Sequence, residues 1–264
     1  MGRANRDNRW LLIFQLVFDE SGLGQNHAFV FAGFLGPLRA WEQFADLWEP
    51  LLKRRQQLTA KGFKRMVSQR PNHRRVHSFV EVLVECKKLY RISVTIPRAA
   101  YQEAILAELP KWEGRLDKAT IALISNEYYL AFYLMVENVL LPMVASLDDR
   151  AELEVIYDEN IQEAEKVESG YAEFIKQTPE AKQFRRTPRS ENDERFLPLQ
   201  AAHLFAWHVH KDYVEKQHGR QHEGSTWKLL NTLPEYPPLV LTEHDLRKII
   251  AWDTLEERMK ELQS

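Results

Sequence analysis

Cysteine is almost absent from this sequence. Cys86 is the only cysteine among 264 residues, so no disulfide can form within the chain, and zinc modules built from several thiolates are excluded. Glycine and proline are also scarce, with 10 and 12 residues, which leaves little room for long flexible linkers. We therefore expect a single domain over residues 1–264, folded almost throughout and kept in a reducing compartment.

Long hydrophobic runs are missing as well. No stretch approaches the ~20 apolar residues that a membrane helix needs. The apolar run that follows Arg3, Arg6 and Arg9 looks like the start of a signal peptide, but it ends at Asp19 without a small-residue cleavage site. These absences predict a soluble protein of the cytoplasm that has no membrane partner.

Several motifs of well-known enzyme classes are absent too. Gly22 and Gly24 match no dinucleotide-binding or P-loop pattern, and no serine lies in a nucleophile elbow. His218 and His222 have the spacing of a zinc-chelating pair, but Gly219 interrupts them and no HExxH motif is present. The sequence therefore does not favour nucleotide-binding enzymes, serine hydrolases or zinc peptidases.

The apolar residues that are present predict alternating strands and helices. Trp10–Phe18 is apolar except for Gln15, which suits a buried strand, and a glycine-containing turn leads to a second strand over 27–35. A third, β-branched strand is expected over 91–96. Helices are expected over 38–57, 76–90, 98–109, 118–144, 163–177, 199–216 and 243–262, the last begun by a capping box of Thr242 and Asp245.

The second half of the chain adds a parallel strand. Glu152–Asp158 reads as a strand followed by a helix, which favours parallel pairing with the first strand, and residues 178–197 have room for one short strand ending near Phe196. The prediction is thus an α/β fold with a mixed sheet, in which strands 1–3 are antiparallel and strand 4 is parallel. Helical insertions are expected at about 38–90 and 98–144, and a C-terminal helix at about 243–262. Ribonuclease H-like proteins have this element order, although periodicity alone does not choose it over other α/β folds. The C-terminal amphipathic helix is also a candidate surface for a homo-oligomer.

Two copies of one local pattern mark candidate chemistry. Phe18-Asp19-Glu20 and Tyr157-Asp158-Glu159 each place Asp-Glu where a buried strand runs out. If the strands are parallel neighbours, ~4.8 Å apart, Asp19 and Asp158 lie side by side, and a hard divalent cation is the usual way to relieve their repulsion. The sequence therefore predicts a Mg²⁺ or Mn²⁺ site. The alternative is that each Asp-Glu pair only marks the exit of a strand into a turn.

A third candidate element is the late helix LQAAHLFAW. Gln200, His203, Trp207 and His210 follow helical spacing and share one face. A neutral imidazole at His203 could ligate a metal ion. A half-buried histidine satisfied by hydrogen bonds is the alternative.

The formal net charge of -2 hides a basic segment. Residues 53–75 hold nine lysines or arginines and no acid. Such a field suits nucleic acid, and the phosphate contacts are expected from Lys64, Arg65, Arg74 and Arg75. A solvated connector is the alternative reading.

Taken together, FDESG, YDE and LQAAHLFAW resemble the family called domain of unknown function 3800 over most of the chain. The resemblance implies a ribonuclease H-like fold with metal ligands at Asp19, Asp158 and His203. His203 stands where the family usually has Asp, so the sequence departs from the pattern at that ligand.

The resemblance further implies two-metal hydrolysis of phosphodiester bonds with Mg²⁺ or Mn²⁺. Glu20, Glu159 and Gln200 are expected to support the three ligands, and a further carboxylate is needed. The glutamates that could supply it, unranked, are Glu20, Glu81, Glu85, Glu127 and Glu159. The alternative is a weakened nucleic-acid-binding or protein-interaction module, and the choice between DNA and RNA stays open.

Overall fold

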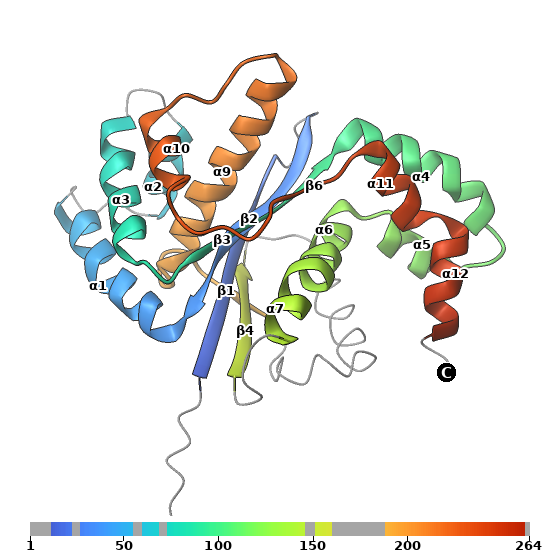
Figure 1. Cartoon of the computed structure of the whole chain (residues 1–264), viewed down its shortest axis with the longest axis horizontal. Helices are drawn as coiled ribbons and strands as arrows, with labels where there is room; N and C mark the ends of the chain where they lie inside the picture. Colours follow the sequence, from blue (N-terminus) through green and yellow to red (C-terminus); the bar gives the residue numbers. More distant parts are fainter. Residues whose placement is uncertain are drawn as a thin grey trace, which may run out of the picture.

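The computed structural model describes residues 12–22, 27–54, 60–68, 73–145, 151–159 and 188–261. Within these ranges six strands form one sheet in the order β5-β4-β1-β2-β3-β6, with helices on both faces (Figure 1). The predicted α/β fold with a mixed sheet is confirmed. The predicted helix over 163–177 and the first two residues of the predicted first strand lie outside the described residues.

The antiparallel half of the sheet matches the predicted strands. β1 (Leu12–Ser21) pairs antiparallel with β2 (Ala28–Pro37), which pairs antiparallel with β3 (Tyr90–Pro97). Gly33 of β2 allows the close approach, because a Cβ there would lie 2.0 Å from the carbonyl oxygen of Val17. β1 continues three residues beyond its predicted end at Phe18, so Asp19 and Glu20 belong to the strand itself.

The parallel half carries the strands that matter for the site. β4 (Ala151–Asp158) lies parallel to β1, and β5 (Arg189–Glu191) lies parallel to β4. The prediction of a strand ending near Phe196 is wrong at its end, because a turn follows β5 before Pro198 begins the next helix. A further short strand, β6 (Leu239–Val240), pairs parallel with β3 and was not predicted.

Side chains alternate along the strands and divide the core into two layers. Val17 and Ile156 belong to the layer on one face, called here the α9 face, and Phe18 and Tyr157 to the layer on the other, called the α6 face. Helices on the α9 face are α1 (Leu38–Arg54), α2 (Ala60–Ser68), α3 (His73–Glu85), α9 (Pro198–Gln217) and α10 (Ser225–Leu230). Helices on the α6 face are α4 (Arg98–Trp112), α5 (Lys118–Ile124), α6 (Glu127–Met135), α7 (Leu141–Ala145), α11 (Glu243–Ile250) and α12 (Trp252–Glu261).

The long helix predicted over 118–144 is not continuous. It breaks between α5 and α6, where the side chain of Asn126 accepts hydrogen bonds from the backbone N–H groups of Tyr128 and Tyr129 and so starts a new helix. A π-helical stretch, η2 (Val136–Leu140), then joins α6 to α7. Hydropathy periodicity shows which residues are buried, but it does not register such a cap.

Other predicted helices change at their ends. α3 stops at Glu85, short of the predicted Tyr90, because Tyr90 opens β3. The predicted capping box of Thr242 and Asp245 is confirmed, but the helix it begins is interrupted at Ala251 and continues as α12.

The described residues contain no single helix with the length and apolar content of a membrane span. Lys118–Ile124 and Glu127–Met143 satisfy the length and composition criteria only as a pair, and they are bent by 69° at their break.

Candidate active site

Asp19 and Asp158 meet at the carboxyl ends of two parallel strands. Phe18 of β1 lies opposite Tyr157 of β4. Asp19 and Asp158 are the next residues on these two strands, so they lie side by side. The prediction that the two strands are adjacent and parallel is confirmed. Both aspartates are nearly inaccessible, at 3% and 2% exposed, and strand alternation turns both toward the α9 face.

Asp193 is a third acidic residue of this cluster, and sequence reasoning missed it. Glu191 of β5 pairs with Asp158, and Asp193 follows two residues later, buried. The signal was present, because Asp193-Glu194 is another Asp-Glu pair just after a strand. It was overlooked because β5 has only three residues and no apolar run.

Gln200 of α9 helps to hold Asp193 in place. Its amide Nε2 donates a hydrogen bond to the backbone carbonyl of Asp193, 2.8 Å away. Its Oε1 accepts one from Nε1 of the buried Trp48, at 2.9 Å. Gln200 thus links α1 and α9 to the loop after β5. Its support of Asp19, Asp158 and His203 stays a prediction.

Lys64 of α2 neutralises the cluster. Its ammonium nitrogen lies 2.6 Å from Oδ2 of Asp158 and 3.0 Å from Oδ2 of Asp193. Burial lowers the pKa of Lys64, but Asp19, Asp158 and Asp193 outweigh burial and hold it above its usual value. Lys64 is therefore charged and contacts buried carboxylates. The sequence predicted that Lys64 would contact phosphate, and it did not predict these contacts.

Two of the other three predicted phosphate contacts are at the surface. Arg65 is exposed on α2 and Arg75 is exposed on α3. The side chain of Arg74 is not among the described ones. Contact of Arg65, Arg74 and Arg75 with phosphate stays a prediction.

His203 contacts the cluster from α9. Its Nδ1 lies 2.8 Å from Oδ2 of Asp19, and because a carboxylate only accepts hydrogen bonds, Nδ1 carries the proton. A neutral ring then has an acceptor lone pair at Nε2. Burial raises the pKa of Asp19, but the hydrogen bond and charge of His203 and the charge of Lys64 outweigh it and hold that pKa below its ordinary value.

Glu20 and Tyr128 approach the same strand end from the α6 face. Burial, the charge of Asp19 and a side-chain hydrogen bond to Asp19 raise the pKa of Glu20 to about 9, so Glu20 is protonated at neutral pH. Its Oε2 is buried without a hydrogen-bond partner, and so is the hydroxyl of Tyr128 in α6. Burial and the charge of Glu20, with smaller effects from Asp19 and Asp158, raise the pKa of Tyr128 well above its usual value.

Glu159 takes a more peripheral position. Its side chain accepts a hydrogen bond from Nδ2 of Asn192, and its backbone N–H donates to the carbonyl of Glu191 at 2.9 Å. These contacts tie the turn after β4 to the turn after β5. Glu159 is exposed, so it supports the loops beside the acidic cluster.

The side chains of the acidic cluster are of the type that binds a hard divalent cation, although Lys64 contacts two of them. Asp19, Asp158 and Asp193 offer carboxylate oxygens, the ligands that Mg²⁺ and Mn²⁺ prefer. The orphaned oxygens of Glu20 and Tyr128 are unusual for buried polar groups, which normally have partners. As the described side chains stand, no group of three or more His, Cys, Asp or Glu is arranged to hold a metal ion, and the ammonium of Lys64 contacts two of the carboxylates.

The late histidines are engaged elsewhere. Nε2 of His222 lies 2.9 Å from Nδ1 of His208, and both rings stack against Trp227. Nδ1 of His218 donates to the carbonyl of Val214 at 2.8 Å. His218 and His222 thus have different hydrogen-bond partners.

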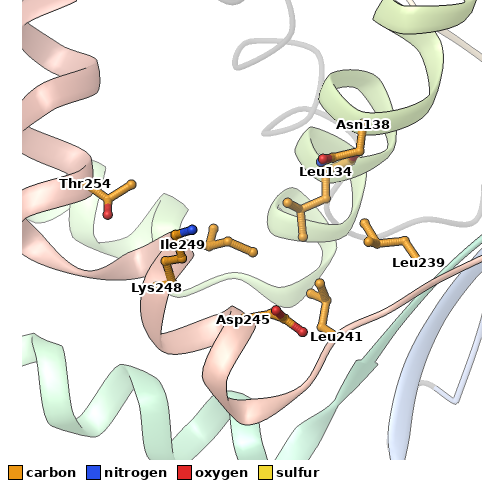
Figure 2. Close-up of a pocket in the computed structure, with 8 residues that line it drawn as sticks. All are labelled: Leu134, Asn138, Leu239, Leu241, Asp245, Lys248, Ile249 and Thr254. Atoms are coloured by element: carbon orange, nitrogen blue, oxygen red, sulfur yellow. The ribbon is translucent and has the colours of Figure 1, made fainter.

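A surface pocket of about 270 Å³ lies on the α6 face (Figure 2). Leu134 and Ile249 contribute to its apolar wall, and Asp245 and Lys248 lie at its polar side. Asp245 is already engaged in the capping box with Thr242. The pocket contains none of the acidic cluster, so it is separate from the candidate active site.

No family model matches the chain, and neither a curated protein nor a solved structure is significantly similar to it.

Proposed function

We propose that the protein is a metal-dependent nuclease that hydrolyses phosphodiester bonds at the acidic cluster. The observation that carries the proposal is the parallel pairing of β1 with β4, which puts the buried Asp19 and Asp158 side by side, with Asp193 after the next strand. A ribonuclease H-like identity of the sheet is part of the proposal. It is supported by the order of antiparallel and parallel strands and by the resemblance of the three sequence motifs.

Each residue of the cluster has a role in this proposal. Asp19, Asp158 and Asp193 would hold Mg²⁺ or Mn²⁺, which when bound supplies an activated water and charge neutralisation at the leaving oxygen. In its neutral form, His203 would contribute through the lone pair of Nε2, because its Nδ1 proton is committed to Asp19. The protonated Glu20 would stabilise the charge of Asp19 through their hydrogen bond, and the hydroxyl of Tyr128 offers a further donor from the other face of the sheet.

The proposed substrate is nucleic acid, either DNA or RNA. A phosphodiester substrate carries negative charge, and Arg65, Arg74 and Arg75 belong to a segment without acidic residues that could bind it. A cytoplasmic location is proposed with it, supported by the presence of a single cysteine, Cys86. Self-association through the C-terminal helix also stays a proposal, and α11 already buries Leu246 and Ile250 in the core.

A second candidate function is favoured by Lys64. If its ammonium stays permanently between Asp158 and Asp193, the acidic cluster is a structural ion-pair network and not a metal site. The protein would then bind nucleic acid or another protein without cleaving anything. This module would keep the same fold.

Cleavage assays distinguish the two functions. We expect the protein to cleave at least one of four labelled substrates, single- or double-stranded DNA or RNA, when Mg²⁺ or Mn²⁺ is present. Chelation of the metal ion and Asp19→Ala should each abolish that cleavage. Binding of nucleic acid without cleavage under every metal condition would contradict the nuclease and favour the binding module.

A further inference from the structure

The buried acidic cluster contains a cation that belongs to the chain itself. Asp158 and Asp193 are 2% and 8% exposed in their side chains, and Lys64 touches both. Because one ammonium nitrogen lies within hydrogen-bond distance of both carboxylates, the two like charges are close neighbours and repel each other. Carboxylates gathered this closely therefore need a positive charge in contact with them, and Lys64 supplies it.

Lys64 and a divalent ion would compete for the same atoms. The ammonium contacts Oδ2 of Asp158 and Oδ2 of Asp193 at hydrogen-bond distance, and these are oxygens that a metal ion would need. An oxygen that faces an ammonium presents its lone pairs to that group. A metal ion at these two oxygens would also be repelled by the adjacent ammonium, so Lys64 and a metal ion compete for this site.

The lysine side chain can leave while its helix stays in place. Lys64 is 30% exposed, far more than its two partners. Its neighbours anchor α2 in the core: Phe63 is fully buried and packs against Trp48 and Phe79, and Val67 is buried too. Rotation of the four-carbon lysine chain therefore suffices to free the carboxylates.

We infer that Lys64 is the resident counter-ion of the acidic cluster and that a divalent ion displaces it. The released ammonium, on a side chain that is already partly exposed, then becomes available to a substrate phosphate. This inference rests on the proposed nuclease function. It predicts that metal affinity is held down by internal competition, and that loading with metal creates part of the binding site for the anionic substrate.

Calorimetric titration with Mn²⁺ alone tests the competition. Lys64→Met should bind Mn²⁺ at least about tenfold more tightly than the wild-type protein, since the competing charge is gone. Lys88→Met removes an exposed positive charge outside the basic segment, so its affinity for Mn²⁺ should match the wild type. Equal or weaker binding by Lys64→Met would overturn the inference while leaving the nuclease proposal intact. Absence of Mn²⁺ binding in all three proteins would contradict both.

A measurement on the wild-type protein covers the case in which Lys64→Met fails to fold. Acetylation of lysines by acetic anhydride, followed by mass spectrometry, reports which ammonium groups are in contact with carboxylates. We expect Lys64 to react several-fold faster once Mn²⁺ is bound, whereas the exposed Lys53 should react at the same rate with and without Mn²⁺. If Lys64 stays equally protected when Mn²⁺ is bound, it is not displaced and the inference fails.

Discussion

Replacing Asp158 with Asn is expected to lower metal-dependent cleavage by more than about 100-fold. Loss of a partner that only orients a metal ligand typically costs 10–100-fold, so loss of a ligand itself should cost more. The fold should survive, because Asn has the same shape and Asp193 remains as an ion-pair partner for Lys64. Initial cleavage rates with Mn²⁺, together with thermal melts of both proteins, measure the two effects separately.

Glu154→Gln is the matched control for this change. Glu154 is a buried acid on β4 with the same alternation as Asp158, but it lies four residues before the strand end and accepts a hydrogen bond from Gln15 at 2.9 Å. Its amide variant should cleave at the wild-type rate. If both variants lose activity equally, the effect comes from damage to the strand. If Asp158→Asn stays active, Asp158 does not belong to the site.

Replacing Glu20 with Gln is expected to stabilise the fold at neutral pH and to flatten its pH dependence. Burial and the charge of Asp19 raise the pKa of Glu20 from 4.5 to about 9, so between these values the folded chain holds a proton that the unfolded chain releases. Stability is therefore lost as pH rises through this window. At pH 7 the cost is up to about 3 kcal/mol, and Gln, which does not ionise, avoids it.

Urea unfolding of the wild type and of Glu20→Gln at two pH values gives the test. The free energy of unfolding should favour the variant more strongly near pH 8 than near pH 5. A difference that is the same at both pH values would mean that Glu20 ionises normally in the folded chain. Glu159→Gln, at an exposed carboxylate one strand away, is a control for which a pH-dependent gain of this size is not expected.

The adjacency of Asp19 and Asp158 was predictable from two features of the sequence. Both residues follow similar buried strands, and the order of strand then helix favoured parallel pairing of these strands. Each aspartate follows an apolar run and an aromatic residue, and such runs are typical of strands buried on both faces. The placement of Glu20 was less clear. If the first strand ended at Phe18, Glu20 would lie in the same turn as Asp19. Instead β1 continues to Ser21, and strand alternation turns Glu20 to the α6 face.

The contacts of Lys64 could not be predicted from the sequence. Lys64 and Asp158 are 94 residues apart, and nothing in the spacing of a charge run tells which lysine will face a carboxylate. Asp193 was hidden for a different reason, since β5 is held by pairing with β4 and has no hydrophobic pattern of its own. Both residues are positioned by tertiary structure, which periodicity does not encode.

The most direct test of a metal site at the ends of β1 and β4 is the position of Mn²⁺ in crystals of the protein, located by anomalous scattering. We predict a manganese peak about 2.1 Å from carboxylate oxygens of Asp19 and Asp158, with the ammonium of Lys64 withdrawn from Asp158. Crystals soaked in Mn²⁺ that show no manganese peak at these carboxylates, and Lys64 still in contact with Asp158 and Asp193, would contradict it.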